Sequence, residues 1–325
     1  MFREILKRLL LAFPTLLGVT LVTFLVIQAA PGDPAELAAG VPRAGADTGR
    51  IEARLRAFMG LDRPPARRYL EWLEKAATLD FGPALDGEPV MDKIVRALPP
   101  TLILGTASFL LGLLFSIPLG VLGASRAGGL LDKALSNLLL VLYSVPSWLA
   151  GLVLILLFGV RLGWFPFQGW RSPEWHEMTF FQSLLDVARH SFLILLAVLL
   201  PGLAHDTLFV RQAVLEEMDK EYVQASRALG LPERRVLWGH AFRNALVPVL
   251  TLVGVSLPGI LAGSVILEQI FSWPGMGRLF FQALQGRDYP VIMAVTTLSA
   301  FLVVAGNLLA DILSVLADPR LRRHG

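Results

Sequence analysis

The chain has 325 residues, of which 54% are hydrophobic and only 17% are charged. Because a typical soluble domain carries roughly 25% charged residues, this composition argues against a soluble fold and predicts an integral membrane protein. The net charge is only +3, and the basic residues flank apolar runs without interleaved aromatic side chains, which argues against nucleic-acid binding. The absence of cysteine excludes disulfides and thiolate metal sites.

Apolar runs without Asp, Glu, Lys or Arg predict the membrane spans, because a helix needs about 20 mostly apolar residues to cross a bilayer. The first run is longer than the apolar region of about 7–15 residues in a signal peptide, so we expect an uncleaved helix. A sixth run, from about His190 to Val210, is interrupted by His205 and Asp206. Prolines inside nearly every run predict kinked helices. The five uninterrupted runs are Leu9–Ala30, Ala97–Ser125, Ala134–Val160, Asn244–Leu267 and Tyr289–Ala310.

Residues 31–96 form a long segment between the first two spans, and its pattern predicts helices. Apolar residues recur at helical spacing on both sides of the Pro64-Pro65 break. We interpret the segment as an outer lid or docking platform, and the alternative is a purely structural elaboration. The recurring residues are Ile51, Leu55, Phe58, Met59, Tyr69, Trp72 and Leu73.

The distribution of basic residues predicts the orientation. With six spans and both termini in the cytoplasm, fourteen Lys and Arg residues lie inside and five lie in the short outer loops. Short loops rich in Lys and Arg stay in the cytoplasm, whereas a loop as long as residues 31–96 is translocated largely regardless of its charge. We therefore expect a multi-pass protein of the bacterial inner membrane with both ends in the cytoplasm.

The loop at residues 212–245, between the fourth and fifth spans, has the most distinctive pattern. Gly230 stands where a helix commonly ends in a left-handed residue, and Pro232 suits the first turn of a second helix. We expect two short helices that meet at an exposed corner beside Glu233, Arg234 and Arg235. This corner could bind a partner protein, or the loop could be an amphipathic segment on lipid headgroups. The apolar stripe that predicts the first helix is Val214, Met218, Tyr222, Ala225 and Leu229.

The segment Gln224–Gly230 (QASRALG) resembles the EAA-x-x-x-G loop of ABC importer permeases, with Gln in place of Glu and Ser in place of the second Ala. Its flanks, Tyr222-Val223, Leu231–Val236 and His240–Pro248, are similar to the dipeptide and oligopeptide branch of that family. In place of the Ile-x-Leu-Pro of the broader family, the chain has His240-Ala241-Phe242-Arg243, which is typical of the peptide branch. Further segments resemble the same branch in order along the chain, namely Gly60–Pro64 with Arg68-Tyr69 and Trp72-Leu73, Pro89-Val90, Leu98–Leu102, Glu268–Gly277, Arg287–Pro290 and Asp318–Arg320.

The resemblance implies an all-α fold of six transmembrane helices of the type I ABC importer permease kind, with a helical extracytoplasmic insertion between the first two. Residues 1–30 would hold the cytoplasmic N-terminus and first span, residues 31–96 the insertion, residues 97–317 the permease core and residues 318–325 a cytoplasmic tail. The chain would not be an enzyme, since no Gly is followed by Lys and no Walker loop can form.

The resemblance also implies the partners. ATP and Mg²⁺ would be bound by two cytoplasmic ATPase subunits, and the chain itself would hold no cofactor or metal. A second, homologous permease chain would complete the path in the lipid bilayer, and an extracytoplasmic binding protein would deliver the substrate. The residues assigned to ATPase coupling are Tyr222, Gln224, Ala225, Ser226, Gly230, Pro232, Glu233 and Arg234.

Two further sets of residues are candidates for the transport path. Trp273, Pro274 and Met276 would form a gate or a docking site for the binding protein, and the alternative is re-entrant packing against lipid. Polar residues within spans usually face a bundle interior, so they would either line the path or form hydrogen bonds between helices. These residues are Asn137, Ser144, Ser256 and Thr297.

Other functions remain open from the sequence. The expected cargo is peptide, but similar permeases carry nickel chelates or sugars. An ion-gradient-driven transporter could use Asp206, Glu268 or Asp311, although all three acids fall near span ends rather than at the midplane. His205 and Asp206 could form a proton relay, but their proximity to Arg211 favours a structural ion pair or a snorkelled span end. A non-transporting membrane scaffold is a third alternative.

Overall fold

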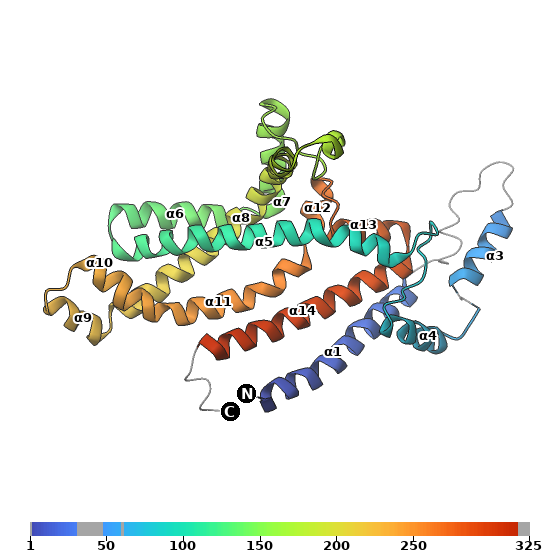
Figure 1. Ribbon diagram of the computed structural model, residues 1–325, viewed down its shortest axis with the longest axis horizontal. Coiled ribbons are helices and arrows are strands. Elements are labelled where there is room, and N and C mark those ends of the chain that lie inside the picture. Colours follow the sequence, from blue (N-terminus) through green and yellow to red (C-terminus); the bar gives the residue numbers. More distant parts are fainter. Residues whose placement is uncertain (1, 31–47, 60–61, 318–325) are drawn as a thin grey trace.

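The computed structural model describes residues 2–30, 48–59 and 62–317, and this part of the chain is almost entirely helical (Figure 1). Five of its helices are long and apolar enough to cross a membrane, and one bent pair of helices would together make a sixth span. Within the described residues, extended backbone pairs only at an isolated bridge between Pro83 and Pro89. The predicted all-α membrane fold is confirmed, with five spans, or six when the bent pair counts as one crossing.

The fourth span is much longer than its apolar run. Helix α8 has 39 residues, which at 1.5 Å per residue corresponds to about 58 Å, roughly twice the thickness of the hydrocarbon core. The helix begins where the Thr179 N–H donates to Gln182 Oε1 at 2.9 Å. It therefore extends beyond the apolar run from His190 to Val210 at both ends. The five continuous helices are α1 (Phe2–Ala29), α5 (Val90–Ser125), α8 (Phe180–Met218), α11 (Phe242–Ala262) and α14 (Tyr289–Ala317).

The third predicted span is sharply bent rather than kinked. It consists of α6 (Leu130–Ser144) followed by α7 (Ser147–Leu154) and the π-helical segment η1 (Ile155–Arg161), at an angle of 94°. The break lies at Val145-Pro146, where Val145 is extended with φ −86° and ψ 120°. A residue before proline avoids the helical region for steric reasons, which explains the position of the break.

The fifth predicted span ends earlier than its apolar run. The sequence predicts a span to Leu267, but α11 ends at Ala262 and a separate short helix, α12 (Val265–Ile270), follows. Gly263 lies between them with φ +67°, in the left-handed region, which breaks the helical path. A turn then leads to α13 (Met276–Gly286), which precedes α14.

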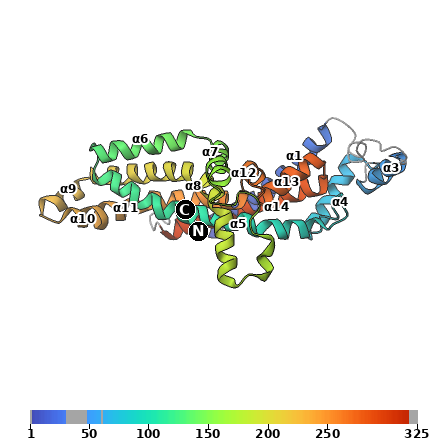
Figure 2. The same ribbon diagram turned by 90° about the horizontal axis from the view of Figure 1, so that it is seen from above.

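Helices α5 and α8 run side by side in the same direction, and small residues on α5 make the close contact possible. A Cβ at Gly120 would lie 2.7 Å from Val210, and a Cβ at Gly123 would lie 3.2 Å from Arg211. Small residues at helical spacing let membrane helices approach closely. This pair forms the centre of the molecule (Figures 1 and 2).

The predicted helices of the first long loop are present as α3 (Thr48–Met59) and α4 (Pro65–Ala77). The Tyr69 hydroxyl lies 2.8 Å from Thr20 Oγ1 on α1, and the Tyr69 ring packs on Phe24 with centroids 5.3 Å apart. Helix α4 is therefore held against the C-terminal half of α1. The side chains of Ile51, Leu55, Phe58 and Met59 lie outside the described residues.

The beginning of α1 and the end of α14 lie toward the same end of the molecule as α9 (Glu221–Ala228) and α10 (Glu233–Arg235), whereas α4 and α13 lie toward the other (Figures 1 and 2). An even number of membrane crossings would give this arrangement, and counting the bent pair as one crossing gives six.

Candidate functional site

The predicted corner is formed by residues 219–241, which we call the corner loop. Helix α9 ends at Ala228, Leu229 is its C-cap residue, and the chain turns through Gly230, whose φ is +77°. The Gly230 N–H donates to the Arg227 carbonyl at 2.9 Å, and the Leu231 N–H donates to the Ser226 carbonyl at 3.3 Å. These two bonds are the pattern of a Schellman helix end, which needs a left-handed residue at the glycine position.

A second short helix follows the turn directly. Pro232 precedes α10, its carbonyl accepts the Arg235 N–H at 2.8 Å, and the π-helical segment η3 (Val236–Ala241) continues into α11. The two helices meeting at Gly230 agree with the sequence prediction.

The buried face of α9 differs from the predicted stripe. Val223 and Ser226 are buried, whereas Tyr222 and Ala225 are exposed and Leu229 is 82% exposed. The stripe assumed one continuous helix, but α8 ends at Met218 and α9 begins anew at Glu221, which changes the helical phase. The inner face of the corner loop packs against the ends of α5, α8 and α11, through a cluster that includes Val121, Ala124, Val210, Val214, Val236, Leu237, Ala241 and Ala245.

Tyr222 connects three elements. Its hydroxyl donates to Glu217 Oε2 on α8 at 2.5 Å and accepts a bond from Asn244 Nδ2 on α11 at 2.9 Å. Burial, followed by the hydrogen bond to the Glu217 carboxylate, raises the pKa of Tyr222 above its usual value. Lys220 also contacts Glu217, at 2.5 Å. The corner loop is thus held to α8 and α11 by these hydrogen bonds as well as by its buried apolar face.

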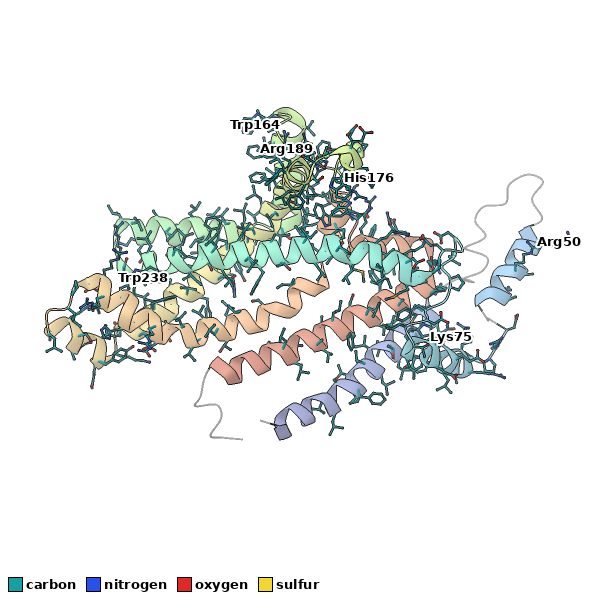
Figure 3. The ribbon with its side chains drawn as sticks, in the orientation of Figure 1. Arg50, Lys75, Trp164, His176, Arg189 and Trp238 are labelled. Atoms are coloured by element: carbon teal, nitrogen blue, oxygen red, sulfur yellow. The ribbon has the colours of Figure 1, made fainter. Side chains whose placement is uncertain are left out.

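The outer face of the corner loop is available for contact. Arg227 and Glu233 form a two-bond ion pair across the corner, at 3.2 and 2.6 Å. Exposed pairs of this kind contribute about 0–1 kcal/mol, so the pair shapes the surface more than it stabilises the fold. Leu229, Pro232 and Arg234 are exposed beside it. Trp238 marks the corner loop in Figure 3.

An ion pair that the sequence pattern did not predict lies next to the corner loop. Arg211 on α8 donates to both carboxylate oxygens of Asp132 on α6, at 2.6 and 2.8 Å. Asp132 is buried and also accepts the Gly128 N–H at 2.9 Å. Of the two interpretations of Asp206, the ion pair with Arg211 is not formed, because Asp206 instead contacts His205 at 3.0 Å. Asp132 and Arg211 are 79 residues apart, and no local pattern relates them.

At the opposite end, the turn Ser272–Gly275 between α12 and α13 forms what we call the gate turn. Trp273 is fully buried, and its Nε1 donates to the Pro100 carbonyl at 3.1 Å. Met276 is also buried, and its N–H donates to Thr101 Oγ1 at 2.8 Å. Of the three predicted gate residues, only Pro274 is partly exposed. The gate turn thus packs beneath the beginning of α5.

Glu268, on helix α12 just before the gate turn, helps to hold the turn in place. Its carboxylate is fully buried and accepts bonds from Thr101 Oγ1 at 3.1 Å and from the Arg278 N–H at 3.0 Å. Burial raises the pKa of Glu268, and these bonds oppose that shift. A Cβ at Gly275 would lie 2.4 Å from both Glu268 Oε2 and Thr101 Oγ1, so only glycine fits there. The acid at this span end is therefore committed to backbone and side-chain donors.

The four predicted path residues do not converge. Asn137 and Ser144 are exposed on α6, and Thr297 borders a different, apolar cavity near α1 and α4. Ser256 lines a cavity of about 230 Å³ between α5, α8 and α11. The hydroxyls of Ser144, Ser256 and Thr297 donate to carbonyls of their own helices. Within the described residues, no group of three or more His, Asp or Glu side chains is placed to hold a metal ion.

Comparison with known proteins places these features in a family. Residues 116–323 match the model of the binding-protein-dependent transport system inner membrane component, and residues 1–105 match the N-terminal model of the same transport membrane component. The chain is similar to the oligopeptide transport system permease protein AppB of Bacillus subtilis, with 39% identity over 319 residues and 98% of each chain covered.

Two further comparisons give one more sequence relative and one solved structure. The di/tripeptide transport system permease protein DppB of Pseudomonas aeruginosa is 39% identical over 341 aligned positions that cover all of both chains. The inward-facing methionine ABC transporter MetNI has a chain that is 18% identical, with a TM-score of 0.49, covering 69% of this chain and 97% of that one. The family matches show that this chain belongs to the inner-membrane permease components of binding-protein-dependent ABC importers, as a non-catalytic, multi-pass membrane subunit.

Proposed function

We propose that this chain forms, with a second and related permease chain, the membrane path of an ATP-driven importer of peptides. The names of the oligopeptide and di/tripeptide permeases among its relatives support peptides as the cargo. A binding protein outside the membrane would deliver the peptide, and two cytoplasmic ATPase subunits would bind ATP and Mg²⁺. The chain itself would then bind no cofactor.

The corner loop is the observation that carries this proposal. Its inner face packs onto the ends of three long helices, so a displacement of the corner is transmitted to all three. Its outer face presents an apolar side chain, Leu229, between charged groups. An apolar anchor with a charged rim suits a groove on a partner protein. We assign this groove to an ATPase subunit, whose closure on ATP would move the helices and open the path outward.

The proposed orientation places the corner loop and both termini in the cytoplasm, because fourteen basic residues then lie inside and five in short outer loops. The gate turn and helix α4 then lie outside, where residues 31–96 form the extracytoplasmic insertion and residues 97–317 the permease core. A loop lying flat on lipid would not need the three-way fastening of Tyr222 to Glu217 and Asn244.

Transport by the complete complex in proteoliposomes tests the proposal. We expect tri-alanine to accumulate only with ATP, with loaded binding protein and with both ATPase subunits, and we expect an ionophore to have no effect. A complex with inactive ATPase subunits is the control. Accumulation driven by a proton or sodium gradient without ATP would overturn the proposal in favour of a secondary transporter.

A further inference from the structure

A basic cavity lies above the gate turn, and nothing described so far uses it. It has a volume of about 670 Å³, and we call it the basic basin. Its walls come from the beginning of α5, from the loop between η1 and α8, and from α13. The residues that matter here are Lys93, Arg96, Arg171, Pro274, Gly275 and Arg278.

The four cations of the basin are unequally neutralised. Lys93 pairs with Asp86 at 2.5 Å, and Arg96 pairs with Glu88. Among the residues that the structure describes, no carboxylate lies within ion-pairing distance of the guanidinium group of Arg171 or Arg278. The basin therefore carries an excess of positive charge.

Both of these arginines are held in place. The Cζ atom of Arg171 lies 4.8 Å from the ring centre of Trp170 and 4.4 Å from that of Trp175. Arg278 donates from one terminal nitrogen to the Ser272 carbonyl at 2.6 Å, while its Nε is buried without a hydrogen-bond partner. A guanidinium stacked on aromatic rings keeps the N–H groups in its own plane free for an acceptor, and a carboxylate matches that geometry.

The basin and the inner cavity both adjoin the gate turn and its network. Pro274 and Gly275 form part of its lining, and Gly275 contacts Thr101 and Glu268. Thr101 and Glu268 in turn line the cavity between α5, α8 and α11. The gate turn and its network thus separate a positively charged outer cavity from a largely apolar inner one.

We propose that the basic basin binds the C-terminal carboxylate of the transported peptide, with Arg171 and Arg278 as the two groups that hold it. This inference rests on the proposed function, because it takes peptides as the cargo and this face as the outer one. Every unmodified peptide carries this carboxylate whatever its side chains. The site would orient a peptide over the gate turn without selecting its sequence.

A single-cysteine reporter measures the basin directly. Gln282 is exposed and lines the basin, and the chain has no cysteine of its own, so Gln282→Cys introduces one thiol there. In the complete transporter, we expect an anionic methanethiosulfonate reagent to react about tenfold faster than a cationic one at low salt. Tri-alanine should slow this reaction and tri-alanine amide should not. Thr78→Cys, which is exposed but does not line the basin, is the control and should show neither effect.

A substitution cycle then tests the assignment of the arginines. Uptake is measured for tri-alanine and for its amide, each loaded to saturation on the binding protein. We expect Arg171→Gln to lower the rate for the free acid about tenfold, to that of the amide, and to leave the amide unchanged. In the reporter assay, Arg278→Gln should remove the slowing of the thiol reaction by tri-alanine. Arg161→Gln, exposed but outside the basin, should change neither uptake rate.

The outcomes separate the possibilities. Equal reaction of the two reagents at Gln282→Cys would overturn the basin itself. Equal losses of uptake for both peptides, together with weaker binding of the loaded binding protein, would overturn the proposal. They would show that the arginines bind the binding protein and not the carboxylate of the peptide. If the wild-type complex takes up no peptide, the proposed function fails. If uptake is normal and the cycle shows no coupling, only this inference fails.

Discussion

The turn at Gly230 allows a graded test of the corner loop. Its φ of +77° lies in the left-handed region, and a Cβ placed there would meet no atom within 4 Å. A substitution therefore introduces backbone strain alone, without a steric clash against a neighbour. That strain is about 1–2 kcal/mol for a residue other than glycine, and asparagine tolerates the region better than most residues.

The strain converts into a binding effect. If the ATPase subunits bind only the native corner, a penalty of about 1–2 kcal/mol lowers the competent population, and with it the apparent affinity, by up to about 5- to 30-fold. We expect Gly230→Val to show this loss in co-purification of the ATPase subunits and a matching loss of uptake, with normal abundance in the membrane. Gly230→Asn should stay close to wild type.

Two results would refute this reasoning. Wild-type co-purification and uptake for Gly230→Val would remove the coupling role and favour a loop that merely lies on lipid headgroups. An equal loss in Gly230→Val and Gly230→Asn would show that the side chain itself disturbs the contact, and that the positive φ is not the cause.

Three further predictions concern other parts of the fold. Asp132→Asn leaves Arg211 without its negatively charged partner at a buried site, and we expect the free energy of unfolding to fall by about 1–3 kcal/mol, measured as a lower thermal unfolding midpoint in detergent. An unchanged midpoint would contradict the stabilising role of the pair. Gly275→Ala should abolish uptake or folding because its Cβ has no room, whereas Gly286→Ala, where a Cβ meets nothing, should behave like wild type; equal behaviour would contradict the packing argument. A cysteine at Thr78 should react with an impermeant thiol reagent in sealed cells, and one at Glu233 should not; labelling at Glu233 would reverse the orientation.

Features with local causes could be predicted from the sequence. The apolar runs predict the spans, because the length of a hydrophobic run is itself the requirement for crossing a bilayer. The turn at Gly230 followed by Pro232 predicts the corner, because both residues act on their own backbone. The helices on either side of Pro64-Pro65 follow from the same kind of local evidence.

Features that depend on contacts distant in sequence could not be predicted. Thr101 and Glu268 are 167 residues apart, and their hydrogen bond forms only once α5 and α12 are packed together. The burial of Val223 in place of Tyr222 depends on where α8 ends. An error of one residue in the predicted helix end exchanges the buried and the exposed side chains. The sequence also marks Trp273 as a gate residue without indicating that it is fully buried.

The fastening of the gate turn limits how the outer end can move. The turn and the first residue of α13 are bonded to Pro100 and Thr101 of α5, and Glu268 of α12 accepts bonds from Thr101 and from the Arg278 N–H, so we expect these pieces to move as one body. At Gly263, between α11 and α12, the backbone leaves helical geometry, and a change of its dihedral angles would tilt that body relative to α11. The outer end of the path would therefore open by a rotation of this intact body about a glycine hinge. A cross-link between α5 and α13 should then be compatible with full transport.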